Sequence, residues 1–377
     1  MHMADALISP AVGGTMWLVT AGVTAYCARQ VRTDAGSDSR RVPLMGVLGA
    51  FIFAAQMVNF SIPGTGSSGH LAGGMILAIL LGPHAAFLTL ASVITVQALL
   101  FADGGLLALG CNVFNMAFFA CFVAYPLLYR PIVGGKPGPR RLLIGSSLAA
   151  IVALQLGAFS VVLETLFSGI TALPFGTFVL LMQPIHLAIG VVEGLVTAAV
   201  VTFVWKARPE VLELAAGLRS TGVSPAFGTG ILPVNRDAGI LPASVGTSSQ
   251  PARTASLKPV LLALSGVTIL TAALLSWFAS THPDGLEWSL ARTTGKTELD
   301  APPDTAHATL ARVQEQTSLL PDYDFRKAEE TSPVAATDAA PGPPVGTSVA
   351  GLAGSAATLA VIVLVGLVLK RRSTPDA

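Results

Sequence analysis

The chain has 377 residues, of which 52% are hydrophobic and only 11% are charged. A soluble domain carries about 25% charged residues. This composition, with a mean hydropathy of +0.68, therefore excludes a soluble protein and predicts an integral membrane protein. The formal net charge of +1, without a basic run interleaved with aromatic residues, also excludes a nucleic-acid partner.

The chain begins with Met1-His2-Met3. A free amine followed by His offers a metal ion three nitrogens in a row: the Met1 amine, the deprotonated His2 amide and the His2 ring. The two chelate rings favour a planar arrangement with one open position, which suits Ni(II), Cu(II) and Co(II), and imidazole is a common fourth ligand. Because the first basic residue is Arg29, we expect no cleaved secretory signal and a free Met1 amine. A His at position two is common, however, and by itself predicts no site.

Apolar stretches that approach the roughly 20 residues of a membrane-spanning helix follow along the chain. They cover residues 9–28, 43–60, 70–82, 84–101, 105–129, 141–167, 178–205, 258–279 and 349–369. The third is short, and Gly73-Gly74 together with Gly82-Pro83 at its end predict a tilted or broken helix between close neighbours. The predicted fold class is an all-α polytopic membrane protein: a seven-helix bundle followed by two C-terminal transmembrane helices.

The basic residues predict the orientation of this bundle. Seventeen of the 22 Lys and Arg residues lie on one side of it, and short cytoplasmic loops collect such residues. The N-terminus is therefore predicted to lie outside and the C-terminus in the cytoplasm. The other five lie in segment 280–348, where 11 acidic residues outnumber them and the length of the loop exempts it from the rule.

The loop after the second stretch, 61–70, falls on the same outer side as His2 and ends with His70. A Gly-rich loop at the outer end of a bundle can fold inward and aim a His at a central cavity. His70 is therefore the candidate fourth ligand. Gly64-x-Gly66-x-x-Gly69 matches a dinucleotide-binding fingerprint, but it lacks the preceding strand and the later acidic residue, so we reject that interpretation.

Strongly polar side chains inside or beside the predicted spans are costly, and they indicate either function or a hydrogen-bond network. Those that can support the metal ligands or line an ion path are Asn59, Asp103, Asn112, Asn115, His186 and Glu193. For any one of them a helix–helix hydrogen bond is the alternative role. His186 and Glu193, two turns apart on one face, can line an ion path or hold their helix against its neighbours.

The composition divides the chain into parts. Residues 1–205 form the predicted seven-helix core, 206–256 a flexible cytoplasmic linker rich in Gly, Pro and Ser, and 257–372 an accessory domain of two helices around outer loop 280–348, before a tail at 373–377. The three cysteines, Cys27, Cys111 and Cys121, are odd in number and lack C-x-x-C spacing, so they predict packing residues rather than a redox or metal site.

Several stretches resemble the CbiM/NikM family, the substrate-binding (S) membrane components of energy-coupling factor (ECF) transporters for cobalt or nickel. They are Met1 to Pro10, Ser68-Gly69-His70-Leu71, Gln97 to Gly105, Leu109 to Met116, Pro184 to Leu187 and Val192-Glu193-Gly194. The segment Pro283-Asp284-Gly285-Leu286-Glu287 resembles the PDGLE signature of the NikN-like accessory subunit of the same systems.

The resemblance implies that Met1, His2 and His70 hold the metal, with no cofactor beyond the transported Ni²⁺ or Co²⁺ and no catalytic residues. It implies a protein of the plasma membrane that works with an ECF scaffold subunit and ATPase subunits. No Walker A motif occurs in the sequence, so ATP chemistry would come from other chains.

Two alternatives stay open at this level. One is an ion-coupled metal transporter that works alone, and the other is an intramembrane metal-dependent enzyme that uses His186 and Glu193. The enzyme would need a further ligand, and the sequence offers no H-E-x-x-H motif. The choice between nickel and cobalt also stays open, because both accept nitrogen ligands.

Overall fold

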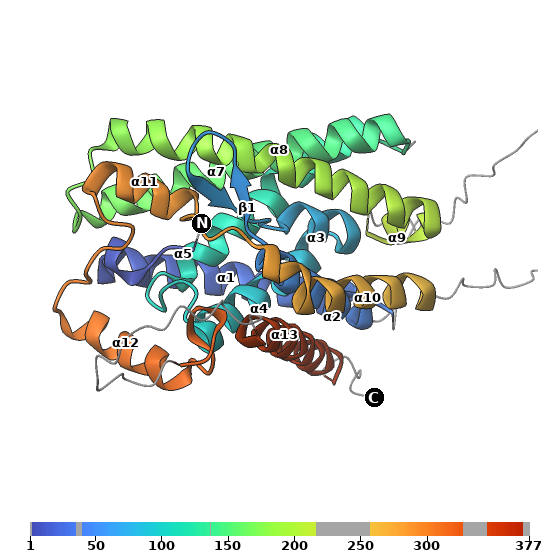
Figure 1. Ribbon diagram of the computed structural model, residues 1–377. Coiled ribbons are helices and arrows are strands. Elements are labelled where there is room, and N and C mark those ends of the chain that lie inside the picture. Colours follow the sequence, from blue (N-terminus) through green and yellow to red (C-terminus); the bar gives the residue numbers. More distant parts are fainter. Residues whose placement is uncertain (1, 35–39, 136, 216–256, 327–344, 372–377) are drawn as a thin grey trace, which may run out of the picture.

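The computed structural model describes residues 2–34, 40–135, 137–215, 257–326 and 345–371, and these are almost entirely helical (Figure 1). The first part contains η1 (Asp5–Leu7), α1 (Pro10–Asp34), α2 (Arg41–Gln56), α3 (Gly74–Leu81), α4 (Pro83–Phe101), α5 (Leu109–Val113), the π-helical η2 (Phe114–Tyr129), α6 (Arg130–Val133), α7 (Pro139–Ser168), α8 (Phe175–Ala207) and α9 (Pro209–Ala215). The second contains α10 (Lys258–Ala273), η4 (Leu275–Phe278), α11 (Gly285–Thr294), α12 (Thr305–Thr317), η5 (Pro321–Tyr323) and α13 (Val345–Arg371).

Six helices of the described residues are long and apolar enough to cross a membrane, which confirms the predicted helical membrane fold. They are Pro10–Thr33, Pro83–Phe101, Leu109–Val133, Pro139–Ser168, Phe175–Ala207 and Val345–Leu369. Three of the predicted spans are shorter than expected: α2 and α10 have 16 residues each, and α3 has eight. α3 is delimited by Gly73 and Gly82, both at positive φ, and all its residues are buried. The number of spans and their orientation remain predictions.

Small residues let the long helices approach each other closely. A side chain at Gly194 of α8 would lie 2.6 Å from the Ser147 backbone of α7, and these two helices pack along their length. Gly49 of α2 and Gly354 of α13 make similar contacts with Ile362 and Phe53 across the α2–α13 interface. The glycines on α2 and α13 therefore leave room for side chains of the facing helix, as is typical of membrane helices, and α10 contacts both of these helices.

The segment predicted as outer loop 280–348 contains helical structure that the sequence did not predict. Its described part holds α11, α12 and the 3-10 helix η5, and α13 begins before its end. α11 begins at the capping box of Asp284 and Glu287, and α12 begins at Asp304, whose side chain accepts the backbone N–H of His307. Such caps satisfy the free N–H groups at a helix start. Of the predicted linker 206–256, the first part forms α9, and residues 216–256 lie outside the described residues, as do Met1 and the tail 373–377.

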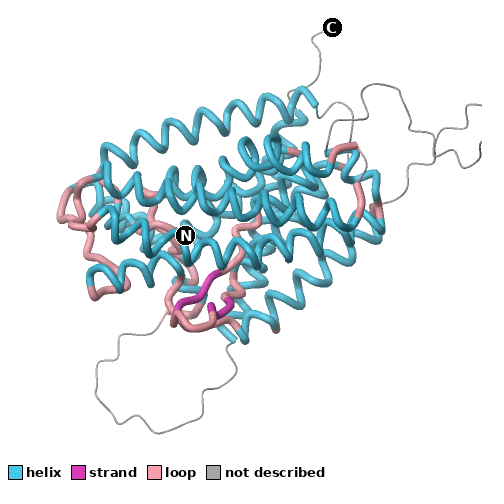
Figure 2. Tube along the Cα trace, turned by 90° about the horizontal axis from the view of Figure 1, so that it is seen from above, coloured by secondary structure: helices cyan, strands magenta, loops and turns pink. Residues whose placement is uncertain are grey.

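A short antiparallel hairpin interrupts the helices at one edge of the bundle (Figure 2). It joins β1 (Phe60–Ile62) to β2 (Ser67–Gly69), with Ser61 opposite Ser68. Gly64 and Gly66 turn the chain between the strands at φ 77° and 76°. The hairpin contacts both α8 and α11, and it carries His70 at its end.

Candidate metal centre

The N-terminal segment is held inside the bundle by its backbone. The Met3 N–H donates to Asn112 Oδ1 at 2.7 Å, and Asn112 Nδ2 donates back to the Met3 carbonyl at 3.1 Å. The Met3 side chain is fully buried. Asn112, a residue singled out from the sequence, thus fixes the position of the residue that follows His2.

The turn after α4 fits around this segment because it contains two glycines. A side chain at Gly104 would lie 2.7 Å from Asn112 Nδ2 and 3.2 Å from His2 Cβ, and Gly104 is also at φ 80°. A side chain at Gly105 would overlap the Asp5 carboxylate. The Asp5 carboxylate accepts the Ala108 N–H at 2.9 Å, so it closes the turn over the N-terminal segment.

His2 forms a hydrogen bond with Asp103 through its ring. Its Nδ1–H donates to Asp103 Oδ1 at 2.7 Å, and the Tyr323 hydroxyl donates to the other carboxylate oxygen. Burial by itself would raise the pKa of Asp103, but the His2 ring and the Tyr323 hydroxyl lower it to about 2. The carboxylate is therefore ionised, and His2 Nε2 is left buried without a hydrogen-bond partner among the described residues.

His70 lies directly against His2. The two rings are stacked, with centroids 5.3 Å apart and planes at 21°. His70 Nδ1–H donates to the Leu71 carbonyl at 3.1 Å, so Nε2 carries the lone pair. Burial lowers the pKa of His70 to about 4, and the ring is neutral at physiological pH, as a metal ligand must be.

Buried polar groups fix the chain that follows His70. The Glu193 carboxylate accepts the N–H groups of Ala72 at 2.7 Å and Gly73 at 3.1 Å. Gln56 Nε2 donates to the Ala72 carbonyl at 2.9 Å, and Gln97 in turn donates to Gln56 at 2.8 Å. Glu193 therefore acts from α8 as an anchor for this loop.

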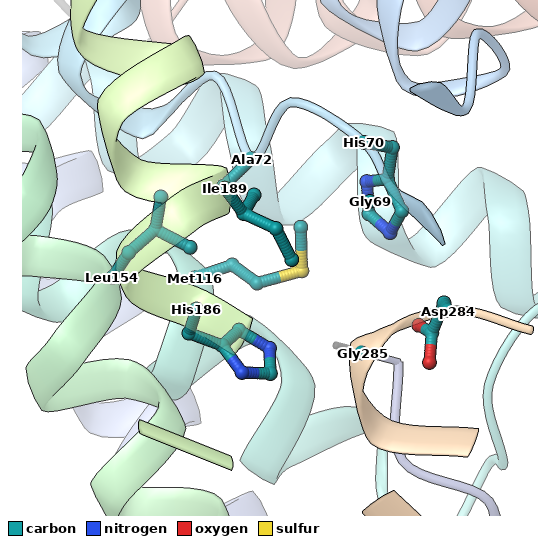
Figure 3. Close-up of a pocket in the computed structure, with 9 residues that line it drawn as sticks. All are labelled: Gly69, His70, Ala72, Met116, Leu154, His186, Ile189, Asp284 and Gly285. Carbon is teal, nitrogen blue, oxygen red and sulfur yellow. The ribbon is translucent and has the colours of Figure 1, made fainter. Parts of the chain in front are cut away.

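His186 faces a small pocket beside His70 (Figure 3). Its Nδ1–H donates to the Met182 carbonyl at 2.8 Å, and its Nε2 is buried without a hydrogen-bond partner in the described part of the chain. The other pocket residues are Gly69, His70, Ala72, Met116, Leu154, Ile189, Asp284 and Gly285. The structure therefore gives different surroundings to His186 and Glu193, which were predicted as a pair. Glu193 accepts hydrogen bonds from the loop after His70, whereas His186 borders the pocket.

The described residues of the predicted accessory domain, 257–326 and 345–371, are called the accessory segment here. This segment contributes residues beside the site that were not predicted from the sequence. Ser68 of β2 donates its N–H to the Pro283 carbonyl at 2.8 Å and its hydroxyl to the His282 carbonyl at 2.7 Å. Gly285 lies where a side chain would be 2.4 Å from Ile185 and 3.1 Å from His186. The spacing Asp284-x-x-Glu287 is a sequence signal for a capping box, and it could have located this helix start.

Two predicted residues lie beside the site rather than in it. Asn115 Nδ2 donates to Glu164 at 2.7 Å and lies 3.7 Å from the sulfur of Met3. Asn59 contacts the accessory segment through its backbone, where its carbonyl accepts the Ser280 N–H at 2.8 Å. Both positions support the packing around the N-terminal segment and the hairpin.

Side chains alone do not complete a metal site in the described part of the chain, which contains no group of three or more His, Cys, Asp or Glu side chains close enough to hold an ion. A metal ion at His2 and His70 would therefore need main-chain donors. The predicted chelate has such donors in the Met1 amine and the His2 amide, and it uses His2 Nδ1, the atom that contacts Asp103 here. Met1 itself lies outside the described residues.

Comparison with protein families gives two matches. Residues 2–211 match the model described as CbiM, cobalt uptake substrate-specific transmembrane region, and residues 258–371 match the PDGLE domain. The CbiM match covers more than half of the chain.

Two individual relatives have names that agree with these matches. A Haloquadratum walsbyi protein provisionally named a metal transport protein is 39% identical over 56% of this chain and 93% of its own length. A protein of Archaeoglobus fulgidus provisionally named fused nickel transport protein NikMN is 38% identical over 57% of this chain and 69% of its own. The solved structure of a transition metal transporter is 31% identical, covers 58% of this chain and 100% of its own, and has a TM-score of 0.49.

Proposed function

The chain belongs to the CbiM family of cobalt uptake substrate-specific transmembrane regions, and on that premise we propose that it captures a cobalt or nickel ion for import. The PDGLE domain follows the CbiM region in the same chain, and the Archaeoglobus fulgidus relative is itself named as a fused nickel transport protein. The chain is thus a member of a metal-transport family rather than of an enzyme family.

The observation that carries the proposal is the contact between His2 and His70. These residues come from the first residues and from the end of a hairpin, and their rings stack at 5.3 Å. Stacking needs at least one uncharged ring, and burial keeps His70 neutral. Two imidazoles held together beside a carboxylate form a nitrogen-rich site suited to Ni²⁺ or Co²⁺.

In the proposed complex the donors are the Met1 amine, the His2 amide, His2 Nδ1 and His70 Nε2. Forming it requires His2 Nδ1 to give up the proton that it shares with Asp103, because a protonated ring nitrogen has no lone pair for a metal. This proton moves to Nε2 of the same ring, and the His2 amide releases its proton to water as the metal binds. We infer that Asp103 first holds the His2 ring in place and then balances part of the charge of the bound cation. Asn112 keeps the backbone of Met3 fixed during this exchange.

The other polar residues have supporting roles in the proposal. Glu193 holds the loop that carries His70, and Asn115 packs against Met3. The Asn59 carbonyl, just before β1, accepts a hydrogen bond from Ser280 and so connects the hairpin to the accessory segment. His186 borders the pocket next to His70, where its free Nε2 can accept a hydrogen bond from a hydrated ion entering or leaving the site.

Import needs an energy source, and the sequence contains no Walker A motif. We therefore propose that an ECF scaffold subunit and ATPase subunits drive the cycle in the plasma membrane, with the N-terminus outside. The alternative is an ion-coupled transporter that works alone. Uptake in cells that lack the ATPase subunits would favour that alternative.

Replacing His70 with Ala tests the capture site. Loss of supporting groups around a metal ligand typically costs 10–100-fold in affinity, so loss of a direct ligand should weaken Ni²⁺ or Co²⁺ binding by about 100-fold or more. Binding is measured by calorimetry on the purified full-length chain with an unextended N-terminus. His282→Ala is the matched control, because His282 is an exposed His of the accessory segment, and its variant should bind normally. Unchanged binding by the His70 variant would contradict the proposal.

A further inference from the structure

His307 on α12 makes an unusual set of contacts between the accessory segment and the N-terminal segment. Its Nδ1 lies 2.6 Å from Asp304 Oδ2, and its Nε2 lies 3.0 Å from the carbonyl oxygens of both Asp5 and Ile8. The His307 side chain is only 2% exposed. His307 is neither one of the residues predicted for the site nor a donor in the proposed metal complex.

The chemistry of the ring decides its charge. All three partners are oxygens that only accept hydrogen bonds, so both ring nitrogens of His307 must donate. A neutral imidazole has one N–H and one lone pair, and either tautomer would set that lone pair against a carboxylate or against two carbonyl oxygens. The contacts therefore fit the doubly protonated imidazolium, with Nδ1–H directed at Asp304 and Nε2–H shared by the two carbonyls.

The charged groups around the ring agree with this assignment. Within the described residues, the titratable groups that act on His307 are Asp304, at the start of its own helix, and Asp5. Burial opposes the charge on His307, but the bonds to Asp304 and to the Asp5 and Ile8 carbonyls outweigh it and raise the pKa of His307 above 6.5.

We propose that His307 is a positioning residue for the N-terminal segment. As an imidazolium it donates hydrogen bonds to Asp304 and to the Asp5 and Ile8 carbonyls, a set of contacts called the clasp below, and so holds the preceding His2 ready for the cation. The clasp grips the carbonyls at both ends of the turn Asp5–Leu7, and the Met3 backbone just before it is held by Asn112. An ordered N-terminal segment binds more tightly, because the apparent dissociation constant rises when only a fraction of the molecules are competent to bind. This role rests on the proposed function, since it concerns the same capture site.

The sign of the pH effect follows from the raised pKa. The clasp is complete below the ordinary His pKa of 6.5 and is lost as the pH rises through the higher value in the folded protein. The metal ligands behave in the opposite way, because imidazole binds metal only when it is deprotonated. Both conditions hold near neutral pH, so the clasp should help capture there and lose its effect in alkaline solution.

The experiment compares the full-length wild-type chain with His307→Gln, which keeps a polar side chain but cannot become a cation. At about pH 7 the variant should bind Ni²⁺ or Co²⁺ roughly tenfold more weakly, which is the scale of one hydrogen bond to a charged group. At about pH 9 the two proteins should bind equally, because the wild type has then lost its clasp. Asp304→Asn should behave like His307→Gln, and the exposed His282→Gln is the control that should match the wild type.

Thermal unfolding of the metal-free proteins provides a second readout that does not depend on the proposed function. The wild type should be more stable than His307→Gln at about pH 6, and this difference should shrink toward about pH 9. If neither the wild type nor any variant binds metal, the proposed function fails. The unfolding data then still show whether the clasp forms and whether it depends on pH. Equal metal binding at pH 7, or a deficit of the same size at both pH values, would overturn the positioning role, as would a difference in stability that does not change with pH.

Discussion

A buried carboxylate on a membrane helix need not bind the transported ion, and Glu193 illustrates this at the scale of a single residue. Both of its oxygens accept backbone N–H groups, from Ala72 and Gly73, which lie two and three residues after His70. The sequence identified Glu193 as a costly residue with two possible roles. The sequence could not decide between these two roles, because the partners of Glu193 are backbone N–H groups far away along the chain. Every residue except proline has a backbone N–H, so the residue type does not reveal such a partner.

Replacing Glu193 with Gln should therefore weaken the loop rather than remove a metal ligand. The amide keeps one acceptor and presents an NH₂ group, so one buried N–H loses its partner at a cost of about 1–3 kcal/mol in the free energy of unfolding. Chemical denaturation measures this loss, and exchange of the amide hydrogens at residues 70–73 should rise in parallel. Glu210→Gln, the same change on α9, should have neither effect. Unchanged exchange at 70–73 would show that Glu193 does not anchor the loop.

At the scale of elements, the PDGLE segment acts as a connector between the accessory helices and the hairpin. α11 lies against α8 (Figure 1) and contacts β2, and hydrogen bonds from Ser68 of β2 reach the carbonyls of His282 and Pro283. The capping box explains the Asp and Glu of the motif, and the close approach to α8 explains its Gly. Part of this was readable from the spacing of Asp284 and Glu287, whereas the contact with α8 depends on tertiary packing.

Gly285→Ala tests this connector. The new methyl group would lie 2.4 Å from Ile185, so α11 must shift away from α8, and overpacking of this kind typically costs about 1–3 kcal/mol. The expected result is faster hydrogen exchange in α11 and slower metal uptake in cells. Gly266→Ala on α10 is the matched control, since a side chain there meets open space. Slow exchange in α11 of the Gly285 variant would show that the helix is not docked through this glycine.

At the scale of the whole molecule, composition and hydropathy predicted the helical membrane fold correctly, because burial in a bilayer demands long apolar helices. They overestimated the lengths of α2, α3 and α10, which have 16, eight and 16 residues. All eight residues of α3 are buried, and hydropathy cannot distinguish contact with protein from contact with lipid. The hairpin and the helices within the predicted outer loop 280–348 were missed for a related reason. Turns and helix caps depend on one to four residues, and a hydropathy average over about 20 residues does not detect them.

The proximity of His2 and His70 was easier to predict than the groups that surround them. His2 and His70 were assigned to one side of the membrane from loop charges and span order, and their rings are in contact. Asp103 and Asn112 were noticed as polar residues, but their partners, His2 Nδ1 and the Met3 backbone, follow only from the fold. Tyr323 and His307 lie in the predicted outer loop 280–348, where polar residues are common, so the sequence did not single them out.

The central claim is that the free amine of Met1 binds the metal together with His2 and His70, and a single added residue tests it most directly. Adding one Gly before Met1 keeps every side chain, but it moves the amine away from His2 and converts the donor at Met1 into an amide. Insertion of the helices should be unaffected, because the loop charges and apolar spans do not change. The measurement is uptake of radioactive Ni²⁺ or Co²⁺ by cells that contain equal amounts of the two proteins in their membranes. We predict that uptake by the extended protein falls to the level of cells without the transporter, whereas uptake at the wild-type rate would contradict the N-terminal capture site.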